Sequence, residues 1–192
     1  MYRIILASAS PRRSELLKQL NIEFEVRPSA TDEEIGGNLS PEKFVEELSR
    51  RKAGDVAAKQ DGKCLVIGAD TIVVKGGVML GKPSDPEHAR KMLRELSNSW
   101  HEVITGVTII ETPGMEALTF HEKTRVKMRD MSDSMIDAYI RTGEPLDKAG
   151  AYGIQGLGAV FIEEIHGCYF NVVGLPLAKL TLMLEKFGVR IL

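Results

Sequence analysis

The chain has 192 residues, a length typical of one domain or of two small lobes that share a core. Its 25 basic residues nearly balance its 27 acidic residues, and the net charge of −2 argues against a nucleic-acid partner bound through a broadly basic surface. No apolar run approaches the roughly 18 residues that a membrane span needs, and no leader-peptide pattern precedes the first strand. We therefore expect a cytoplasmic protein without a membrane partner.

Strands in the first two thirds of the chain are predicted from short apolar runs. Arg3–Ser8 has the length and composition of a buried strand, and the Lys75-Gly76-Gly77-Val78 segment is typical of a hairpin turn. Two strand halves are predicted on either side of Gly68-Ala69-Asp70, and a long hairpin further on. Their bounds are Cys64–Ile67 and Thr71–Val74 for the halves, and Trp100–Glu111 and Ala117–Met128 for the hairpin.

Three helices are predicted from one repeated signal, in which a capping side chain precedes a proline. A Ser or Asp side chain accepts a hydrogen bond from the first turn, and Pro fits the first helical position. The three starts are Ser10-Pro11, Ser40-Pro41 and Asp85-Pro86, and the second and third helices are expected to end near Lys59 and Leu96.

The last third of the chain is predicted to contain two helices, two strands and a glycine-rich segment. One helix begins after Ser132 and the other after Gly174-Leu175-Pro176, and strands are expected at Ala159–Ile165 and Cys168–Val173. The order of elements is mixed, so the sequence predicts a single α/β domain over residues 1–192, built around a long mixed sheet.

The first candidate site is Ser8-Ala9-Ser10-Pro11-Arg12-Arg13, where a strand leads into a helix. A helix N-terminus presents unpaired N–H groups, and an Arg fork matches phosphate oxygens, so this segment favours a phosphate. The plainer interpretation is a capped helix with two solvated arginines.

The second candidate is Asp70, which follows an apolar strand and a Gly-Ala pair. A carboxylate at such a position can hold a divalent cation or accept a proton from water. Alternatively, Asp70 is a turn residue that bonds its own backbone.

The remaining candidates are weaker when taken one at a time. Gly76–Pro83 has the glycine and lysine spacing of a P-loop, but Pro83 lacks the required hydroxyl and N–H, so only Lys82 stays a candidate for a phosphate. Glu33 and Lys52 also fit solvated surface, and Gln155 lies in a glycine-rich segment where its amide could recognise a base edge.

Taken in order, these motifs resemble the Maf family of nucleoside triphosphate pyrophosphatases. The resemblance rests on SASPRR at residues 8–13 with Glu15-Leu16-Leu17, then on Gly68-Ala69-Asp70-Thr71, and then on Gly81-Lys82-Pro83. The match extends from Ile4 to Leu177. EPLDKAGAYGIQG at 144–156 and GCYFNVVGLPL at 167–177 look like the subgroup that acts on dTTP and UTP. The resemblance implies a Maf/ITPase-like α/β fold, in which a long bent mixed sheet separates two lobes with a central cleft.

The resemblance also implies roles for individual residues. Asp70 matches the proton acceptor, and Arg12, Thr71 and Gln155 match three positions associated with pyrimidine selectivity. The other polar pocket positions are matched by Ser8, Arg13, Glu33, Lys52 and Lys82. Glu33 and Asp70 are expected to bind Mg²⁺ or Mn²⁺ through carboxylate oxygens, and Asp32-Glu33-Glu34 leaves a one-residue slip open.

The implied reaction is hydrolysis of dTTP or UTP to the nucleoside monophosphate and pyrophosphate, by attack of water on the α-phosphorus. The family was first named for the inhibition of septum formation, so the resemblance also implies a role in cell-division arrest. Two alternatives stay open: a non-catalytic nucleotide sensor that acts through a division-protein partner, and the same chemistry on another nucleotide such as 7-methyl-GTP. A homodimer is the default expectation, because two-fold assemblies are common.

Overall fold

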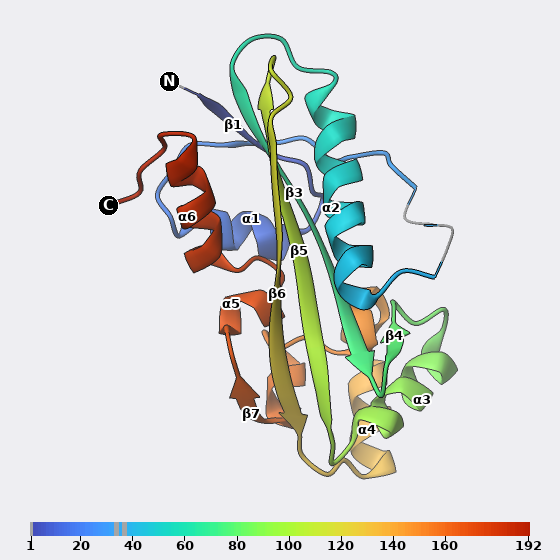
Figure 1. Ribbon diagram of the computed structural model, residues 1–192. Coiled ribbons are helices and arrows are strands. Elements are labelled where there is room, and N and C mark those ends of the chain that lie inside the picture. The colour runs from blue at the N-terminus through green and yellow to red at the C-terminus, as the bar shows by residue number, and fades with distance from the viewer. Residues whose placement is uncertain (1, 33–34, 36–37) are drawn as a thin grey trace. The chain divides into compact units, whose positions relative to one another are not determined.

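The computed structural model describes residues 2–32, 35 and 38–192, and it contains one mixed seven-stranded sheet (Figure 1). The strand order is β2-β1-β3-β5-β6-β7, and β4 pairs with β3. β1 runs parallel to β2 and β3, whereas β4 is antiparallel to β3 and β7 is antiparallel to β6. The α/β class with a mixed sheet is therefore confirmed. The strands are β1 Arg3–Leu6, β2 Glu25–Val26, β3 Cys64–Lys75, β4 Val78–Leu80, β5 Trp100–Thr112, β6 Ala117–Met128 and β7 Ile162–His166.

The three proline-started helices form where the sequence predicts them. In α2 and α3 the capping side chains of Ser40 and Asp85 accept from the N–H groups of Lys43 and His88, whereas Ser10 makes no such bond at the start of α1. Within the described residues, no helix is both long and apolar enough to cross a bilayer. The helices are α1 Pro11–Lys18, α2 Pro41–Ala57, α3 Pro86–Leu96, α4 Asp133–Arg141, α5 Tyr169–Val173 and α6 Leu177–Lys186, with short 3₁₀ turns η1 Glu144–Asp147, η2 Ala149–Ala151 and η3 Leu157–Phe161.

Two strand predictions near the C-terminus need correction. Cys168–Val173 is not a strand, because residues from Tyr169 onward form the short helix α5. The amide of Asn171 in this helix donates to the Val103 carbonyl and to the Thr124 hydroxyl, and these tertiary bonds outweigh the local β-propensity. The strand predicted at Ala159–Ile165 begins later, since η3 occupies its first residues.

The strand β3 is continuous, so the two predicted halves are one element that passes through Gly68-Ala69-Asp70. A Cβ on Gly68 would lie 2.3 Å from the Ser49 carbonyl oxygen of α2, and a Cβ on Gly106 of β5 would lie 2.2 Å from that of Val45. These two glycines let the strands contact the helix backbone directly, which fixes where each turn of α2 lies along β3. Figure 1 shows α2 running alongside this part of β3.

The chain divides into two compact units. Unit 1 comprises Met1–Asp70, Thr105–Glu122 and Gly174–Leu192, and unit 2 comprises Thr71–Ile104 and Lys123–Val173. Each has its own apolar core: Ile5, Val56, Val66 and Ile110 belong to one in unit 1, and Leu93, Leu96, Val126 and Phe161 to one in unit 2. The single domain over residues 1–192 stays a prediction.

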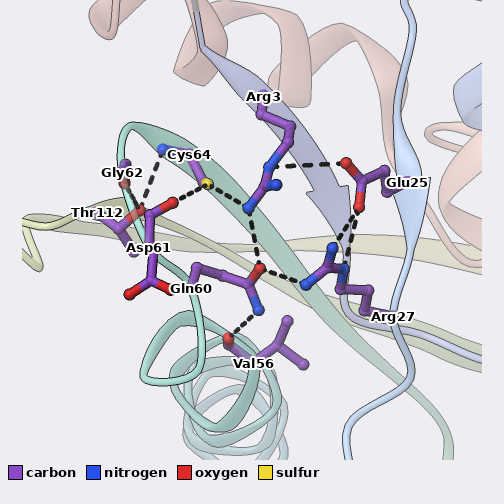
Figure 2. Close-up of polar contacts among 9 residues, drawn as sticks. All are labelled: Arg3, Glu25, Arg27, Val56, Gln60, Asp61, Gly62, Cys64 and Thr112. Carbon is purple, nitrogen blue, oxygen red and sulfur yellow. Dashed lines mark hydrogen bonds and ion pairs between the residues drawn. The ribbon is translucent and has the colours of Figure 1, made fainter.

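A polar network fixes the start of β1 in unit 1 (Figure 2). The Arg3 guanidinium donates to Gln60 Oε1 at 3.2 Å and to the thiol of Cys64 at 3.3 Å, and it lies 3.6 Å from a carboxylate oxygen of Glu25. Arg27 donates to the same Gln60 oxygen and to Glu25, and the Gln60 amide donates to the Val56 carbonyl of α2, so α2, β1, β2 and β3 are tied together at this end.

Candidate functional site

A buried ion pair lies at the centre of the candidate site in unit 1. Asp70 Oδ1 accepts a hydrogen bond from Lys52 Nζ at 2.7 Å, and both side chains are almost entirely withdrawn from solvent. Lys52 lies three residues after Ser49, the α2 residue that contacts Gly68, so the close packing of helix on strand brings the ammonium to the carboxylate. The pair holds the Asp70 carboxylate in one orientation.

Arg13 connects three segments, one of which is the part of β3 that leads into Asp70. Its Nε donates to the Gly174 carbonyl at 2.9 Å, and its Nη1 donates to the Ala69 carbonyl at 2.9 Å and to the Ser8 hydroxyl at 3.2 Å. The guanidinium therefore fixes the backbone of the residue next to Asp70. It makes these three bonds at once, in a geometry that a Lys could not reproduce.

Ser8 lies just beyond β1 and is buried. Its Oγ accepts from the backbone N–H of Ser10 at 3.3 Å as well as from Arg13. A hydroxyl that accepts two hydrogen bonds still has its own proton to donate, so Ser8 can serve an anionic ligand at the start of α1. Arg12 is half-buried in the first turn of the same helix.

The structure thus brings Ser8, Arg13, Lys52 and Asp70 together in unit 1. Thr71 follows Asp70 directly on β3 as the first residue of unit 2, where Lys82 and Gln155 also lie. Lys82 is exposed between β4 and α3, and Gln155 is half-buried between η2 and η3. Glu33, the other predicted metal ligand, lies outside the described residues.

Several groups that shape the site were not predicted from the sequence. The carbonyls of Ala69 and Gly174 position Arg13, although backbone groups have no side-chain signature. Glu144 and Tyr139 contact the segment that carries Gln155. Glu144 opens the EPLDKAGAYGIQG motif, and this position in the motif is the signal that could have identified it.

A separate cavity of about 810 Å³ lies in unit 1 around the start of β1. Its lining includes Tyr2, Arg3, Glu25, Phe187 and Arg190, and it includes none of the predicted site residues. Ser8 lies five residues further along the chain from Arg3, roughly 17 Å away along an extended strand. This cavity is therefore distinct from the Asp70 cluster.

Comparison with known proteins places these residues in a family. The sequence pattern described as Maf-like protein matches residues 3–187. Proteins named dTTP/UTP pyrophosphatase from Acetivibrio thermocellus and Caldicellulosiruptor bescii are each 52% identical to this chain. The first alignment covers 100% of this chain and 98% of the relative, and the second covers 98% and 96%. The solved Ham1 protein of Staphylococcus aureus overlaps 67% of this chain and 72% of its own, at 18% identity and a TM-score of 0.47. On the family match and the full-length relatives, the chain belongs to the family of Maf-like proteins.

Proposed function

We propose that this protein is a nucleotide pyrophosphatase that hydrolyses dTTP and UTP to the nucleoside monophosphate and pyrophosphate. The observation that carries the proposal is the buried Asp70 carboxylate, which is held by Lys52 at 2.7 Å and follows Ala69, whose carbonyl accepts a hydrogen bond from Arg13. The names of the full-length relatives support the same activity. A non-catalytic nucleotide sensor would not need a fixed carboxylate that accepts a proton from water, so the arrangement at Asp70 favours an enzyme.

In the proposed reaction, water attacks the α-phosphorus and the bond from that phosphorus to the bridging oxygen breaks, which releases pyrophosphate. Asp70 accepts the proton of the attacking water. Because Oδ1 is engaged by Lys52, we assign the proton to Oδ2, the oxygen outside the ion pair. A fixed general base of this kind typically contributes about 10²–10⁴-fold to the rate.

Cationic and hydroxyl groups of the chain stabilise the triphosphate in this proposal. Negative charge spreads over the phosphate oxygens in the transition state, so catalysis is mainly positioning and electrostatic stabilisation. Lys52 holds its positive charge at the Asp70 carboxylate, Arg13 holds a second positive charge at the Ser8 hydroxyl, and that hydroxyl has a proton to donate. Lys82 adds a further point charge, consistent with its exposure.

The donor chemistry of Asp70 fits a divalent cation. Mg²⁺ is usually bound through one or two carboxylates together with substrate phosphates and water, so a single buried carboxylate beside a triphosphate site is suitable. The described residues contain no group of three or more His, Cys, Asp or Glu that could hold a metal ion. Asp70, with Glu33 as the second proposed ligand, would hold Mg²⁺ or Mn²⁺, which would neutralise phosphate charge when bound.

Gln155, Thr71 and Arg12 are proposed to select the pyrimidine base. Uracil and thymine present two carbonyls around one N–H, and the Gln155 amide can both donate to and accept from such an edge. A site built on these hydrogen bonds rejects a base with the inverted pattern, because its own polar groups would lose their partners. The homodimer and the division-protein partner stay predictions.

The test is to incubate the purified protein with Mg²⁺ or Mn²⁺ and a panel of NTPs, dNTPs and 7-methyl-GTP, and to separate the nucleotide products. We expect monophosphate and pyrophosphate from dTTP and UTP, with kcat lowered about 10²-fold or more in Asp70→Asn. Diphosphate with inorganic phosphate would contradict the proposed bond cleavage. Binding of nucleotides without any hydrolysis would favour the sensor.

A further inference from the structure

The carboxylate of Glu144 binds the glycine-rich segment that carries Gln155. Its Oε2 accepts from the backbone N–H of Leu157 at 2.9 Å, and its Oε1 accepts from that of Gly158 at 3.0 Å. Glu144 is half-buried at the start of η1, thirteen and fourteen residues before these two amides. One side chain therefore fixes the backbone immediately after Gln155.

Tyr139 fixes the other end of the same segment. Its hydroxyl donates to Glu144 Oε1 at 2.9 Å and accepts from the backbone N–H of Gly153 at 3.3 Å. The Tyr139 ring is buried against Phe161 in a T-shaped contact, and burial raises the pKa of the phenol, so the hydroxyl keeps the proton that it donates. Glu144 and Tyr139 together bind residues on both sides of Gln155.

Two glycines of the segment lie where a side chain would not fit. Gly156 has a φ of +86°, and a Cβ there would lie 2.9 Å from Glu144 Oε2. A Cβ on Gly158 would lie 2.4 Å from the Gly153 carbonyl oxygen and 2.7 Å from the Tyr139 hydroxyl. Residues 153–158 therefore close on themselves over the carboxylate, with Gln155 in the middle of the loop.

We propose that Glu144 is a positioning residue for base selection, which holds the loop 153–158 so that Gln155 is presented in one fixed arrangement. The inference rests on the proposed function, because it assigns Glu144 to the pyrimidine selectivity of that site. Glu144 acts through Gln155 and needs no contact with the nucleotide. This contact explains the motif EPLDKAGAYGIQG at 144–156, because its first residue, Glu144, binds the backbone of Leu157, which directly follows the motif.

The ionised carboxylate suits this role better than a neutral side chain would. Burial by itself would raise the pKa of Glu144, but the hydrogen bonds from Gly158, Leu157 and Tyr139 outweigh it and leave the pKa below its ordinary value. An amide at this position has one acceptor oxygen, and its NH₂ group would face a backbone N–H. Glu144→Gln therefore removes one of the two backbone contacts with little change of volume.

The first part of the test measures selectivity as the ratio of kcat/KM for UTP to that for CTP. We expect Glu144→Gln to lower this ratio at least about tenfold, toward the value of Gln155→Ala. In the Gln155→Ala background, Glu144→Gln should lower the ratio no further, because both changes act on one group. Tyr139→Phe, which keeps the ring and removes the hydroxyl, should shift the ratio in the same direction. Glu163→Gln, at an exposed carboxylate on β7, is the charge-matched control and should leave the ratio unchanged.

The second part measures hydrogen exchange of the backbone amides in a peptide that spans 153–158. Exchange should be faster in Glu144→Gln and unchanged in Glu163→Gln, whether or not any nucleotide is cleaved. Unchanged exchange in Glu144→Gln would overturn the proposal, and so would an equal loss of kcat/KM for every nucleotide. If the wild type cleaves neither dTTP nor UTP, the proposed function fails and Glu144 has no selectivity to control, while the exchange measurement still shows whether it holds the loop.

Discussion

Replacing His101 with glutamine is expected to make the protein less sensitive to acid. His101 on β5 is buried, its Nε2 pairs with the Tyr152 hydroxyl at 2.7 Å, and its Nδ1 is buried without a hydrogen-bond partner in the described part of the chain. Burial, aided by the nearby charge of Lys75, lowers the pKa of His101 to about 4. Tyr152 precedes Gly153 directly, so this contact also supports the base of the loop 153–158.

The sign and size of the effect follow from the two pKa values, about 4 in the folded protein and about 6.5 in the unfolded chain. Between these values the unfolded chain binds a proton at His101 that the folded protein does not, so stability falls as the pH is lowered through this range. The loss is about 2–3 kcal/mol at pH 4.5, relative to pH 8, and it is slightly larger below pH 4. The amide introduced by His101→Gln can still pair with the Tyr152 hydroxyl but does not titrate, so this part of the acid sensitivity should disappear.

Urea unfolding at pH 8 and pH 4.5 measures the effect directly. The difference in unfolding free energy between these two pH values should be about 2–3 kcal/mol smaller in His101→Gln than in the wild type. His88→Gln is the matched control, because it makes the same substitution at a histidine that is exposed on α3. A His101→Gln variant with the same pH dependence as the wild type would refute the buried neutral imidazole.

Four further substitutions test the packing and the charges of the site. Gly68→Ala should cost about 1–3 kcal/mol of stability and lower kcat, because the new Cβ lies 2.3 Å from the Ser49 carbonyl oxygen and displaces α2. Gly54→Ala, whose Cβ meets only an ordinary 3.9 Å contact, should be neutral or stabilising in the same thermal unfolding experiment. Arg13→Lys should cost about 1–3 kcal/mol and weaken hydrolysis of every nucleotide, whereas Arg12→Ala should change the ratio of UTP to CTP hydrolysis. Uniform effects from both arginine variants would make Arg12 a phosphate contact only.

Local signals in the sequence were sufficient for the elements whose ends are determined locally. The helices α2 and α3 begin where Ser40 and Asp85 cap a proline-started turn, because capping depends only on neighbouring residues. The short helix α5 could not be predicted in this way. Its conformation depends on bonds from Asn171 to Val103 and Thr124, which lie 68 and 47 positions away in the chain.

The same distinction applies to the site. Lys52 and Asp70 were both candidates, but their pairing depends on how α2 packs over Gly68, a contact that no local pattern encodes. Arg13 was expected to meet phosphate, and the structure shows in addition that its Nε and Nη1 hold the backbone at Ala69 and Gly174. The resemblance to the Maf family identified residues singly, and the geometry shows which of them lie together.

The most direct test of the proposed chemistry is hydrolysis of UTP in water labelled with ¹⁸O, with the label located by mass spectrometry. Attack on the α-phosphorus, with Asp70 as the base, predicts one ¹⁸O in UMP and none in pyrophosphate. The yield of labelled UMP should fall about 10²-fold or more in Asp70→Asn. Label in pyrophosphate would mean that water attacks the β-phosphorus, and full activity of Asp70→Asn would mean that another group accepts the proton; either result would contradict the account.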